Sequence, residues 1–239
     1  MSKFSDFVRR KTAASCSAVV VAAGSSVRMG EDKMFMDIAG MPVLARTLLA
    51  LNSCACVDEI ILVVRADCLE KASQLCVEYN ANKVTKVVCG GNNRNESALS
   101  GLSEILRNAK VAIIHDGARP FVTEEIVKNV VHAAALHKCA APAIPVTDTI
   151  KTAENGLVTG TLERSSLVAM QTPQAFQPDL LKTALTKAVR DGINYTDDCA
   201  AVEALGALIH LTEGAPENIK ITRPLDVKLA EAIIQSRSQ

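Results

Sequence analysis

Short apolar runs alternate with stretches of helical periodicity along most of this 239-residue chain, and that alternation constrains the fold more than any other feature. The runs contain many β-branched residues, a pattern typical of strands buried on both faces of a sheet. They occupy residues 18–21, 59–64, 83–89, 111–115 and 139–146. Strands joined by helical crossovers form right-handed βαβ units. We therefore expect an α/β fold: a single-domain, Rossmann-like, open and mostly parallel twisted sheet with helices on both faces.

The stretches between and after these runs carry the start and stop signals of helices. Asp67 and Thr123 are suited to cap the helices that follow them, and Gly206 is suited to end a helix. Helices are expected at 42–52, 67–79, 96–107, 123–138, 178–190, 197–205 and 224–235, and further strands at 208–212 and 218–222.

The alternation breaks at about residues 147–172. Asn155-Gly156, between runs rich in Thr and Val, is a strong hairpin signal. We expect a β-arm that projects from the sheet and either covers an active site or contacts a partner subunit. Residues 1–15 read as a flexible N-terminal extension, and 16–239 as one domain that carries the arm.

The charge and cysteine content narrow the classes of function. Lys plus Arg and Asp plus Glu number 26 each, so the formal net charge is zero, which argues against nucleic acid as a partner. No apolar run approaches the ~18 residues of a membrane span. The eight cysteines form no C-x-x-C pair, and no histidine lies at zinc-site spacing. We expect reduced thiols and a cytoplasmic protein.

The loop after the first strand is a candidate anion site. It contains Ala22, Ala23 and Gly24, small residues whose backbone N–H groups can approach a phosphate closely. Arg28 and Lys33 follow in the same segment. The alternative is an ordinary strand-to-helix turn with solvated charges.

Several well-known motifs are absent from this loop and from the chain. A P-loop, a dinucleotide fingerprint and a G-x-S-x-G nucleophile elbow all fail to match. Phosphate chemistry without a protein nucleophile remains, and it needs convergent cations because the reacting groups repel each other. Arg28, Lys33 and Lys220 come from suitably separate places in the chain. Taken singly, Lys220 could be a solvated lysine and Arg119 a structural ion-pair partner.

The motifs, taken together and in order, resemble those of one family. They are A-A-G-x-x-x-R-M-G at 22–30, Gly90-Gly91 with Arg94 and Ser97, H-D-G-A-R-P at 115–120, Q-T-P-Q-A-F at 171–176, T-D-D at 196–198 and N-I-K-I-T-R-P at 218–224. Over residues 17–234 the chain is similar to the 2-C-methyl-D-erythritol 4-phosphate cytidylyltransferases of the non-mevalonate isoprenoid pathway. The resemblance implies an enzyme that transfers CMP from CTP to methylerythritol phosphate by in-line attack and releases pyrophosphate. Alternatives are a ribitol 5-phosphate cytidylyltransferase and a non-catalytic nucleotide-binding scaffold.

The resemblance also implies roles for individual residues. Arg28, Lys33 and Lys220 would be catalytic. The nucleotide-binding residues would be Ala22, Ala23, Gly24, Gly91, Asn92 and Ser97, and the substrate-binding residues Asp116, Arg119, Thr149, Arg164 and Thr196.

The remaining implications concern the metal and the oligomer. Mg²⁺ or another divalent cation would be held mainly by the CTP phosphates, with Asp116 as a further ligand. A homodimer would form through the arm, so that Thr149 and Arg164 reach the partner's site. The chain departs from the family pattern around the catalytic lysine, which lies in Asp32-Lys33-Met34.

Overall fold

The computed structural model describes residues 15–24 and 32–237, and its centre is an eight-stranded sheet. The strand order is β10-β7-β11-β6-β1-β4-β5, with β12 also paired to β7. Four neighbouring strands are parallel, namely β1 (Cys16–Val21), β4 (Glu59–Val64), β5 (Val84–Cys89) and β6 (Val111–Asp116). Beyond β6 lie β11 (Gln174–Phe176), β7 (Cys139–Pro145), β10 (Val168–Met170) and β12 (His210–Glu213). β11 is antiparallel to both of its neighbours, and β12 is parallel to β7.

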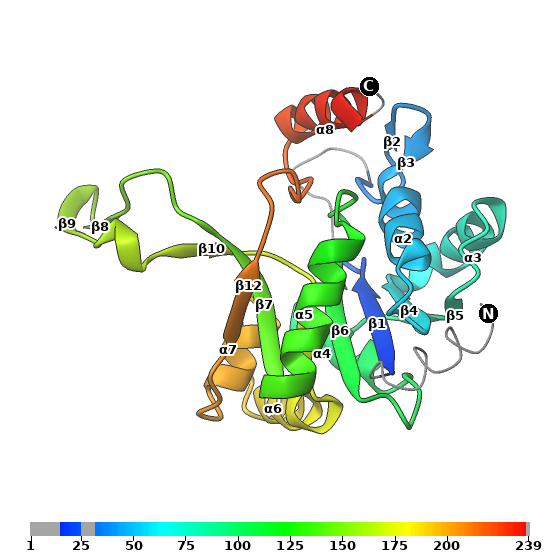
Figure 1. Ribbon diagram of the computed structural model, residues 1–239, viewed down its shortest axis with the longest axis horizontal. Coiled ribbons are helices and arrows are strands. Elements are labelled where there is room, and N and C mark those ends of the chain that lie inside the picture. Colours follow the sequence, from blue (N-terminus) through cyan, green and yellow to red (C-terminus); the bar gives the residue numbers. More distant parts are fainter. Residues whose placement is uncertain (1–14, 25–31, 238–239) are drawn as a thin grey trace, which may run out of the picture.

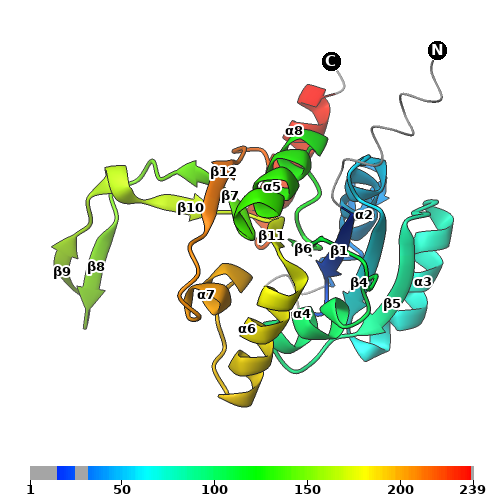
Figure 2. The ribbon, with the colours of Figure 1, turned by 60° about the horizontal axis from the view of Figure 1, so that its bottom comes forward.

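Helices cover both faces of this sheet (Figures 1 and 2). One face carries α2 (Val43–Ser53), α3 (Leu69–Glu78), α5 (Glu124–His137) and α8 (Pro224–Arg237); the other carries α4 (Arg94–Leu102), α6 (Pro178–Arg190) and α7 (Asp198–Glu203). Ala18 and Val20 pack into the first apolar core and Val19 into the second. Because successive side chains of a strand point to opposite faces, an uninterrupted apolar strand is required here. The expected fold class is confirmed.

The arm is also confirmed (Figures 1 and 2). β8 (Lys151–Glu154) and β9 (Leu157–Thr161) form a separate two-stranded antiparallel sheet. Asn155 and Gly156 have φ values of 49° and 81°, and this pair of positive values suits the hairpin turn that Asn-Gly favours. A short 3₁₀ turn, η2 (Arg164–Ser166), precedes the return of the chain into the main sheet through β10.

Several local expectations are wrong. The helix expected at 96–107 is α4 and ends at Leu102, and Ala204 rather than Gly206 is the C-cap of α7. Asp67 does not cap a helix: it accepts a hydrogen bond from the Arg65 guanidinium at 3.0 Å, inside the 3₁₀ turn η1 (Ala66–Cys68) that precedes α3. The segment 218–222 is not a strand. It is irregular chain fixed by tertiary hydrogen bonds, such as that from Ile221 N–H to the Ala118 carbonyl at 2.8 Å.

Several short strands were not anticipated. β10 and β11 are three residues long, and the hairpin of β2 (Asp37–Ile38) and β3 (Met41–Pro42) has two residues a strand. Runs this short show no measurable periodicity. The end of the expected extension, Ser15, donates a hydrogen bond to the Asn108 carbonyl at 2.8 Å, while residues 1–14 lie outside the described part. Within 15–24 and 32–237, none of the helices has the length and apolar character needed to cross a membrane.

Candidate active site

The first parallel strands lie on one side of β1 and a later one lies on the other, so the order in which the chain adds strands to the sheet reverses at β1. The carboxyl edge of the sheet at this point is the candidate site. From β1 the chain proceeds to β4 and β5 on one side, and later to β6 on the other. Such a reversal opens a crevice beyond the strand ends, the usual ligand site of an open α/β sheet. Ala22 N–H donates to the Val63 carbonyl at 2.7 Å, and Gly117 N–H to the Val21 carbonyl at 2.9 Å. The loops after β1 and β6 are therefore fixed side by side at this edge.

Close approach of these loops requires glycine at two positions. A Cβ on Gly90 would lie 2.5 Å from the Cβ of Ala23 and 2.8 Å from the Oγ of Ser97. A Cβ on Gly117 would lie 2.9 Å from the Cβ of Ala22. The loops that follow β1, β5 and β6 thus meet at one place, with small residues facing each other.

Hydrogen bonds with residues at the start of α4 fix the conformation of the loop after β5. Asn93 caps this helix by accepting from Glu96 N–H at 2.9 Å. Ser97 Oγ accepts from Gly91 N–H at 3.2 Å and donates to the Asn93 carbonyl at 2.8 Å. Glu96 accepts from the backbone and side-chain amides of Asn92 at 2.9 and 3.0 Å. The structure thus places Gly91, Asn92 and Ser97, all expected to bind the nucleotide, beyond the carboxyl end of β5, and Ser97 helps to shape this loop.

In the described part of the chain, five charged side chains, three cations and two carboxylates, gather at the end of β6. Asp116 Oδ2 lies 2.9 Å from Lys220 Nζ and 3.5 Å from Arg119 Nε, and Oδ1 lies 3.8 Å from an Arg94 terminal nitrogen. The same Arg94 nitrogen lies 2.7 Å from Oδ2 of Asp198. Only 10% of the Asp116 side chain is exposed. The expected substrate residues Asp116 and Arg119 and the expected catalytic Lys220 therefore form one cluster.

The two carboxylates of this cluster have pKa values displaced in opposite directions. Burial alone would raise the pKa of Asp116, but the charges of Lys220 and Arg94 outweigh it and hold that pKa well below its usual range. Burial raises the pKa of Asp198, and Arg94 offsets this only in part. Burial would lower the pKa of Arg94, but attraction to Asp198 holds it above its usual value. Asp116 is thus the permanent anion of the cluster.

A buried histidine holds the backbone of the same turn. Asp116 N–H donates to Oγ1 of Thr172 at 3.1 Å. The Thr172 hydroxyl lies 3.0 Å from His115 Nδ1, and His115 Nε2 lies 3.2 Å from the Arg119 carbonyl. With the His115 proton assigned to Nε2, every donor and acceptor in this series of hydrogen bonds has a suitable partner. Burial lowers the pKa of His115 to about 4, so the ring is neutral near pH 7.

The lowered pKa of His115 predicts that the stability of the protein depends on pH. Between pH 6.5 and about 4 the unfolded chain binds a proton at His115 that the folded chain does not, so stability falls as the pH falls through this window. The full loss is about 3 kcal/mol. In urea unfolding, the stability advantage of the wild type over His115→Asn should shrink as the pH drops from 7 to 4.5. An advantage independent of pH would contradict the prediction.

The expected catalytic pair of the first loop is only partly described. Arg28 lies outside the described residues, whereas Lys33 is half-buried in a turn that precedes β2. Asp32 accepts from Arg65, at the end of β4, at 2.8 Å and from Met34 N–H at 3.2 Å. The unusual Asp32-Lys33-Met34 sequence thus has a structural reason: Asp32 ties this turn to the carboxyl edge of the sheet.

Three expected substrate residues are not brought into the cluster. Thr149 and Arg164 belong to the arm, where Arg164 donates to the Thr147 carbonyl at 3.0 Å. The arm extends away from the body of its own chain in both views (Figures 1 and 2). Thr196 is exposed and directly precedes Asp197, the N-cap of α7.

Sequence reasoning missed the partners that build the cluster. Arg94 and Asp198 both lie in recognised motifs, but nothing in the sequence marks them as an ion pair. Asn218 is fully buried: its carbonyl accepts from Arg119 at 2.6 Å and its amide donates to the Thr172 carbonyl at 2.9 Å. These hydrogen bonds bring the segment that carries Lys220 to β6. In the sequence Asn218 is one of several polar residues of the N-I-K-I-T-R-P motif, so nothing marks it as buried.

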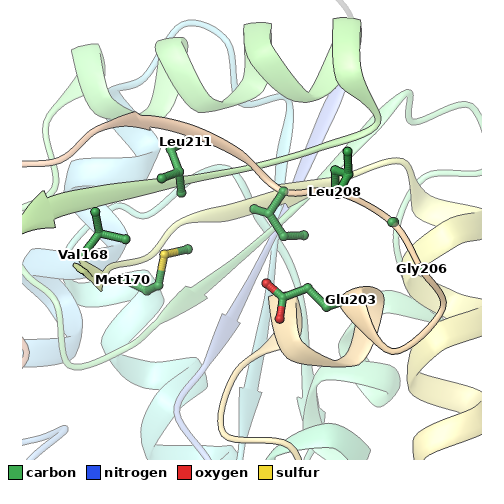
Figure 3. A pocket seen from close by; sticks show the side chains of 8 residues that line it. Val168, Met170, Glu203, Gly206, Leu208 and Leu211 are labelled. Carbon is green, nitrogen blue, oxygen red and sulfur yellow. The ribbon is translucent and has the colours of Figure 1, made fainter. Parts of the chain in front are cut away.

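A separate apolar pocket lies beside β10 and β12, at the lateral edge of the sheet that is farthest from β5 (Figure 3). Its volume is about 520 Å³, and its lining comes from β10, the end of α7, the following loop and β12. The lining residues are Val168, Met170, Glu203, Gly206, Ala207, Leu208, Ile209 and Leu211. None of them belongs to the Asp116 cluster, and the chemistry of a phosphate site is lacking here.

Comparison with known proteins gives a consistent result. The family model for 2-C-methyl-D-erythritol 4-phosphate cytidylyltransferase matches residues 16–236. Proteins of that name from Clostridium novyi (strain NT) and Dehalococcoides mccartyi (strain CBDB1) are 39% and 42% identical, over 92% and 91% of this chain and 96% and 95% of theirs. The crystal structure of 4-diphosphocytidyl-2C-methyl-D-erythritol synthase from Anaerococcus prevotii DSM 20548 matches with a TM-score of 0.83 and 30% identity, over 93% of this chain and 97% of that chain. That of the cytidylyltransferase from Thermus thermophilus matches with a TM-score of 0.76 and 30% identity, over 91% and 98%.

Proposed function

Because the chain belongs to the 2-C-methyl-D-erythritol 4-phosphate cytidylyltransferase family, we propose that the cluster around Asp116 is the acceptor half of its active site. The protein is a cytidylyltransferase that forms 4-diphosphocytidyl-2-C-methyl-D-erythritol from CTP and 2-C-methyl-D-erythritol 4-phosphate in isoprenoid biosynthesis. The observation that carries the proposal is the convergence of Lys220, Arg119 and Arg94 on one buried carboxylate beside the β1 loop.

Electrostatic repulsion is the main obstacle to this reaction. A nucleoside triphosphate carries about four negative charges and a phosphomonoester about −1.5 to −2. At ~4 Å each unit-charge pair repels by about 4 kcal/mol at an effective dielectric constant near 20. Lys220 has three N–H donors, and its contact with Asp116 occupies one of them. Its side chain is 40% exposed, so the acceptor phosphate can reach the others.

The remaining roles follow from position around the crevice. The backbone N–H groups of 23 and 24 bind the CTP phosphates, because small residues leave these amides accessible. The N–H of Ala22 donates to the Val63 carbonyl instead, so Ala22 would contribute only its small side chain to this part of the site. Gly91, Asn92 and Ser97 position the nucleotide. Arg28 and Lys33 stabilise the charge on the pentacoordinate phosphorus, where a positioned donor has its largest effect.

On the acceptor side, four residues hold the methylerythritol phosphate: Asp116, Arg119, Thr196 and Lys220. Arg119 is oriented for this by the Asn218 carbonyl. The acceptor phosphate oxygen attacks the α-phosphorus in line and pyrophosphate leaves from the opposite side.

The residues present suit a divalent cation that is bound chiefly through substrate. Within 15–24 and 32–237 no group of three His, Cys, Asp or Glu side chains is placed to hold a metal ion. Mg²⁺ commonly uses one or two carboxylates together with substrate phosphates, so Asp116 with the triphosphate is a sufficient ligand set. When bound, the cation neutralises triphosphate charge. Asp116 would supply the single protein carboxylate.

A substrate comparison tests the function. Pyrophosphate release from CTP is measured with 2-C-methyl-D-erythritol 4-phosphate and, separately, with ribitol 5-phosphate. We expect turnover with the first substrate. Turnover with ribitol 5-phosphate alone would overturn the assignment, and CTP binding without turnover of either acceptor would favour a non-catalytic scaffold.

We further propose a homodimer in which the arm completes the partner's site. The arm exposes apolar side chains, among them Leu157 and Val158, which are 72% and 66% exposed. Exposed apolar groups gathered on one element are typical of an interaction surface. The dimer would bring Thr149 and Arg164 to the acceptor phosphate of the partner subunit.

Mixing two inactive variants tests this arrangement. Arg28→Ala impairs the β1 loop and Arg164→Ala impairs the arm, so each homodimer should have little activity. A mixed dimer has both residues intact in one of its two sites, so it should have about half of the activity of a wild-type dimer. Random exchange of an equal mixture makes about half of the dimers mixed, and the mixture should therefore recover about a quarter of wild-type activity. Size-exclusion chromatography and mass measurement establish that mixed dimers form. Mixed dimers without recovered activity would show that the arm serves its own subunit.

The thiols support a reducing compartment, and we propose the cytoplasm. All eight cysteines are free, and five of them are buried. Burial raises the pKa of Cys54 to about 12 and that of Cys76 to about 11, which keeps both as unreactive thiols.

A further inference from the structure

Arg94 lies between two carboxylates that have different surroundings. It is the first residue of α4, and Asp198 is the first residue of α7. One Arg94 nitrogen lies 2.7 Å from Asp198 and 3.8 Å from Asp116. The Asp198 side chain is completely buried, whereas Asp116 retains 10% exposure at the crevice. The Arg94 guanidinium therefore pairs with the buried carboxylate of Asp198 and lies beyond hydrogen-bond distance of Asp116.

The two oxygens of Asp116 are not equivalent. Oδ2 contacts Lys220 at 2.9 Å and Arg119 at 3.5 Å. Oδ1 has only the distant Arg94 at 3.8 Å, and among residues 15–24 and 32–237 no hydrogen bond to it is formed. A carboxylate oxygen accepts up to two hydrogen bonds. Oδ1 therefore keeps its accepting capacity for a hydroxyl or a cation in the crevice.

Asp198 is fixed in place by the sheet. Gln174 of β11 is buried, and its Oε1 accepts from the backbone N–H groups of Asp198 and Cys199, both at 3.1 Å. Its amide nitrogen donates to the Asp197 carboxylate at 2.8 Å. The N-terminus of α7 is thereby anchored to a central strand, so Asp198 cannot follow Arg94 toward the crevice.

We propose that Asp198 is a positioning residue. It holds the Arg94 guanidinium back from Asp116 and so keeps Oδ1 of Asp116 open to accept from a hydroxyl group of the polyol phosphate. The inference rests on the proposed function in that it takes Asp116 as an acceptor-binding group. Arg94 is a charge-assisted donor whose pairing with a carboxylate is strong at short distance. Without the charge of Asp198, the nearest anion to Arg94 is Asp116. A shift of about 1 Å in the guanidinium would then close Oδ1 with a charge-assisted hydrogen bond of ordinary length.

The test uses Asp198→Asn, Arg94→Gln and the double variant. Asp198→Asn keeps the shape of the side chain but removes the charge that restrains Arg94. We expect kcat/KM for methylerythritol phosphate to fall about 10- to 100-fold, the size of effect that loss of a supporting partner has at metal sites. The fall should come mainly through KM for this substrate rather than through kcat, because the variant changes only which group occupies Oδ1 of Asp116.

The double variant separates positioning from a merely structural role. It replaces the ion pair by two neutral amides that can pair with each other, and it has no guanidinium to cover Oδ1. We expect it to recover to within about fivefold of wild-type kcat/KM, which is better than Asp198→Asn alone. This expectation also holds if Asp198→Asn by itself does not fold. A double variant as impaired as Asp198→Asn, or more so, would overturn the proposal.

The matched control is Asp179→Asn. Asp179 is likewise an acidic residue in the first turn of a helix, α6, but its side chain is exposed. This variant reproduces the loss of first-turn charge and should keep wild-type kinetics. The whole series is run with the polyol phosphate that the wild type accepts, and thermal unfolding is recorded for every variant. A wrong substrate assignment then appears in the wild type, whereas a failure of this inference appears only in the variants.

Discussion

Asp116→Asn should reduce kcat/KM for methylerythritol phosphate by about 10³-fold, which corresponds to about 4 kcal/mol of transition-state stabilisation. Asp116 is the common anion of Lys220, Arg119 and Arg94, and its carboxylate is held ionised by them. Asparagine leaves Lys220 and Arg119 facing each other without their carboxylate partner, while Arg94 keeps only its pairing with Asp198. Those side chains will move apart and lose the geometry that binds the acceptor.

Stability should fall together with activity. Breaking a buried ion pair by removing one partner costs about 3–5 kcal/mol, because the other charge stays buried without compensation. Thermal unfolding measures this loss, and CTP titration of the folded variant shows whether the nucleotide half is intact. The matched control is Asp58→Asn, an exposed carboxylate at the amino edge of the sheet, whose Oδ2 accepts from Cys16 N–H. Activity of Asp116→Asn within tenfold of wild type would contradict the assignment of the cluster.

Lys33→Ala should lower turnover by about 10²–10³-fold, the effect of removing one donor aimed at developing charge. The turn that carries Lys33 is anchored to the carboxyl edge of β4 through the ion pair of Asp32 with Arg65. A lysine on an anchored turn keeps its position without the cost of ordering a mobile loop. The loss should therefore be in kcat rather than in KM for CTP.

Single-turnover kinetics at saturating CTP measure this effect directly. Lys71→Ala is the control, because the Lys71 ammonium lies 4.1 Å from the centre of the Phe35 ring, next to the same turn. It removes a neighbouring lysine from the same region of the surface, and it should leave kcat unchanged. A near-normal rate for Lys33→Ala would show that this residue is only a surface lysine.

The fold could be predicted from the sequence to the extent that its signals are local. Buried parallel strands must be continuously apolar, so β1, β4, β5, β6 and β7 were recognisable in the sequence and lie within two residues of their expected bounds. Asn155-Gly156 marked the hairpin because positive φ at both positions is a property of those residues. β11 was missed because three residues carry no period, and 218–222 was misassigned because an apolar-polar alternation can also occur in irregular chain.

Some residues of the site could likewise be predicted from the sequence, and others could not. Asp116 and Arg119 were predicted from one motif and Lys220 from another, and the structure places the Arg119 and Lys220 side chains 3.5 and 2.9 Å from the Asp116 carboxylate. Arg94 and Asp198 are 104 positions apart in the chain, and only the packing of α4 and α7 on the same face of the sheet makes them partners. The catalytic and binding roles of all the predicted site residues stay predictions, those of Arg28, Thr149, Arg164 and Thr196 included.

The sequence by itself therefore determined the fold class, the arm and the identity of most charged groups at the carboxyl edge. Only the tertiary structure decided which cation faces which carboxylate, because ion-pair partners are set by distance in space and leave no periodic trace in the chain. It also decided that Asp198 is buried and Asp116 reaches the crevice. Burial acts to raise the pKa of both aspartates, but the charges of Lys220, Arg94 and Arg119 outweigh it at Asp116, whereas Arg94 offsets it only in part at Asp198, so the two pKa values are displaced in opposite directions.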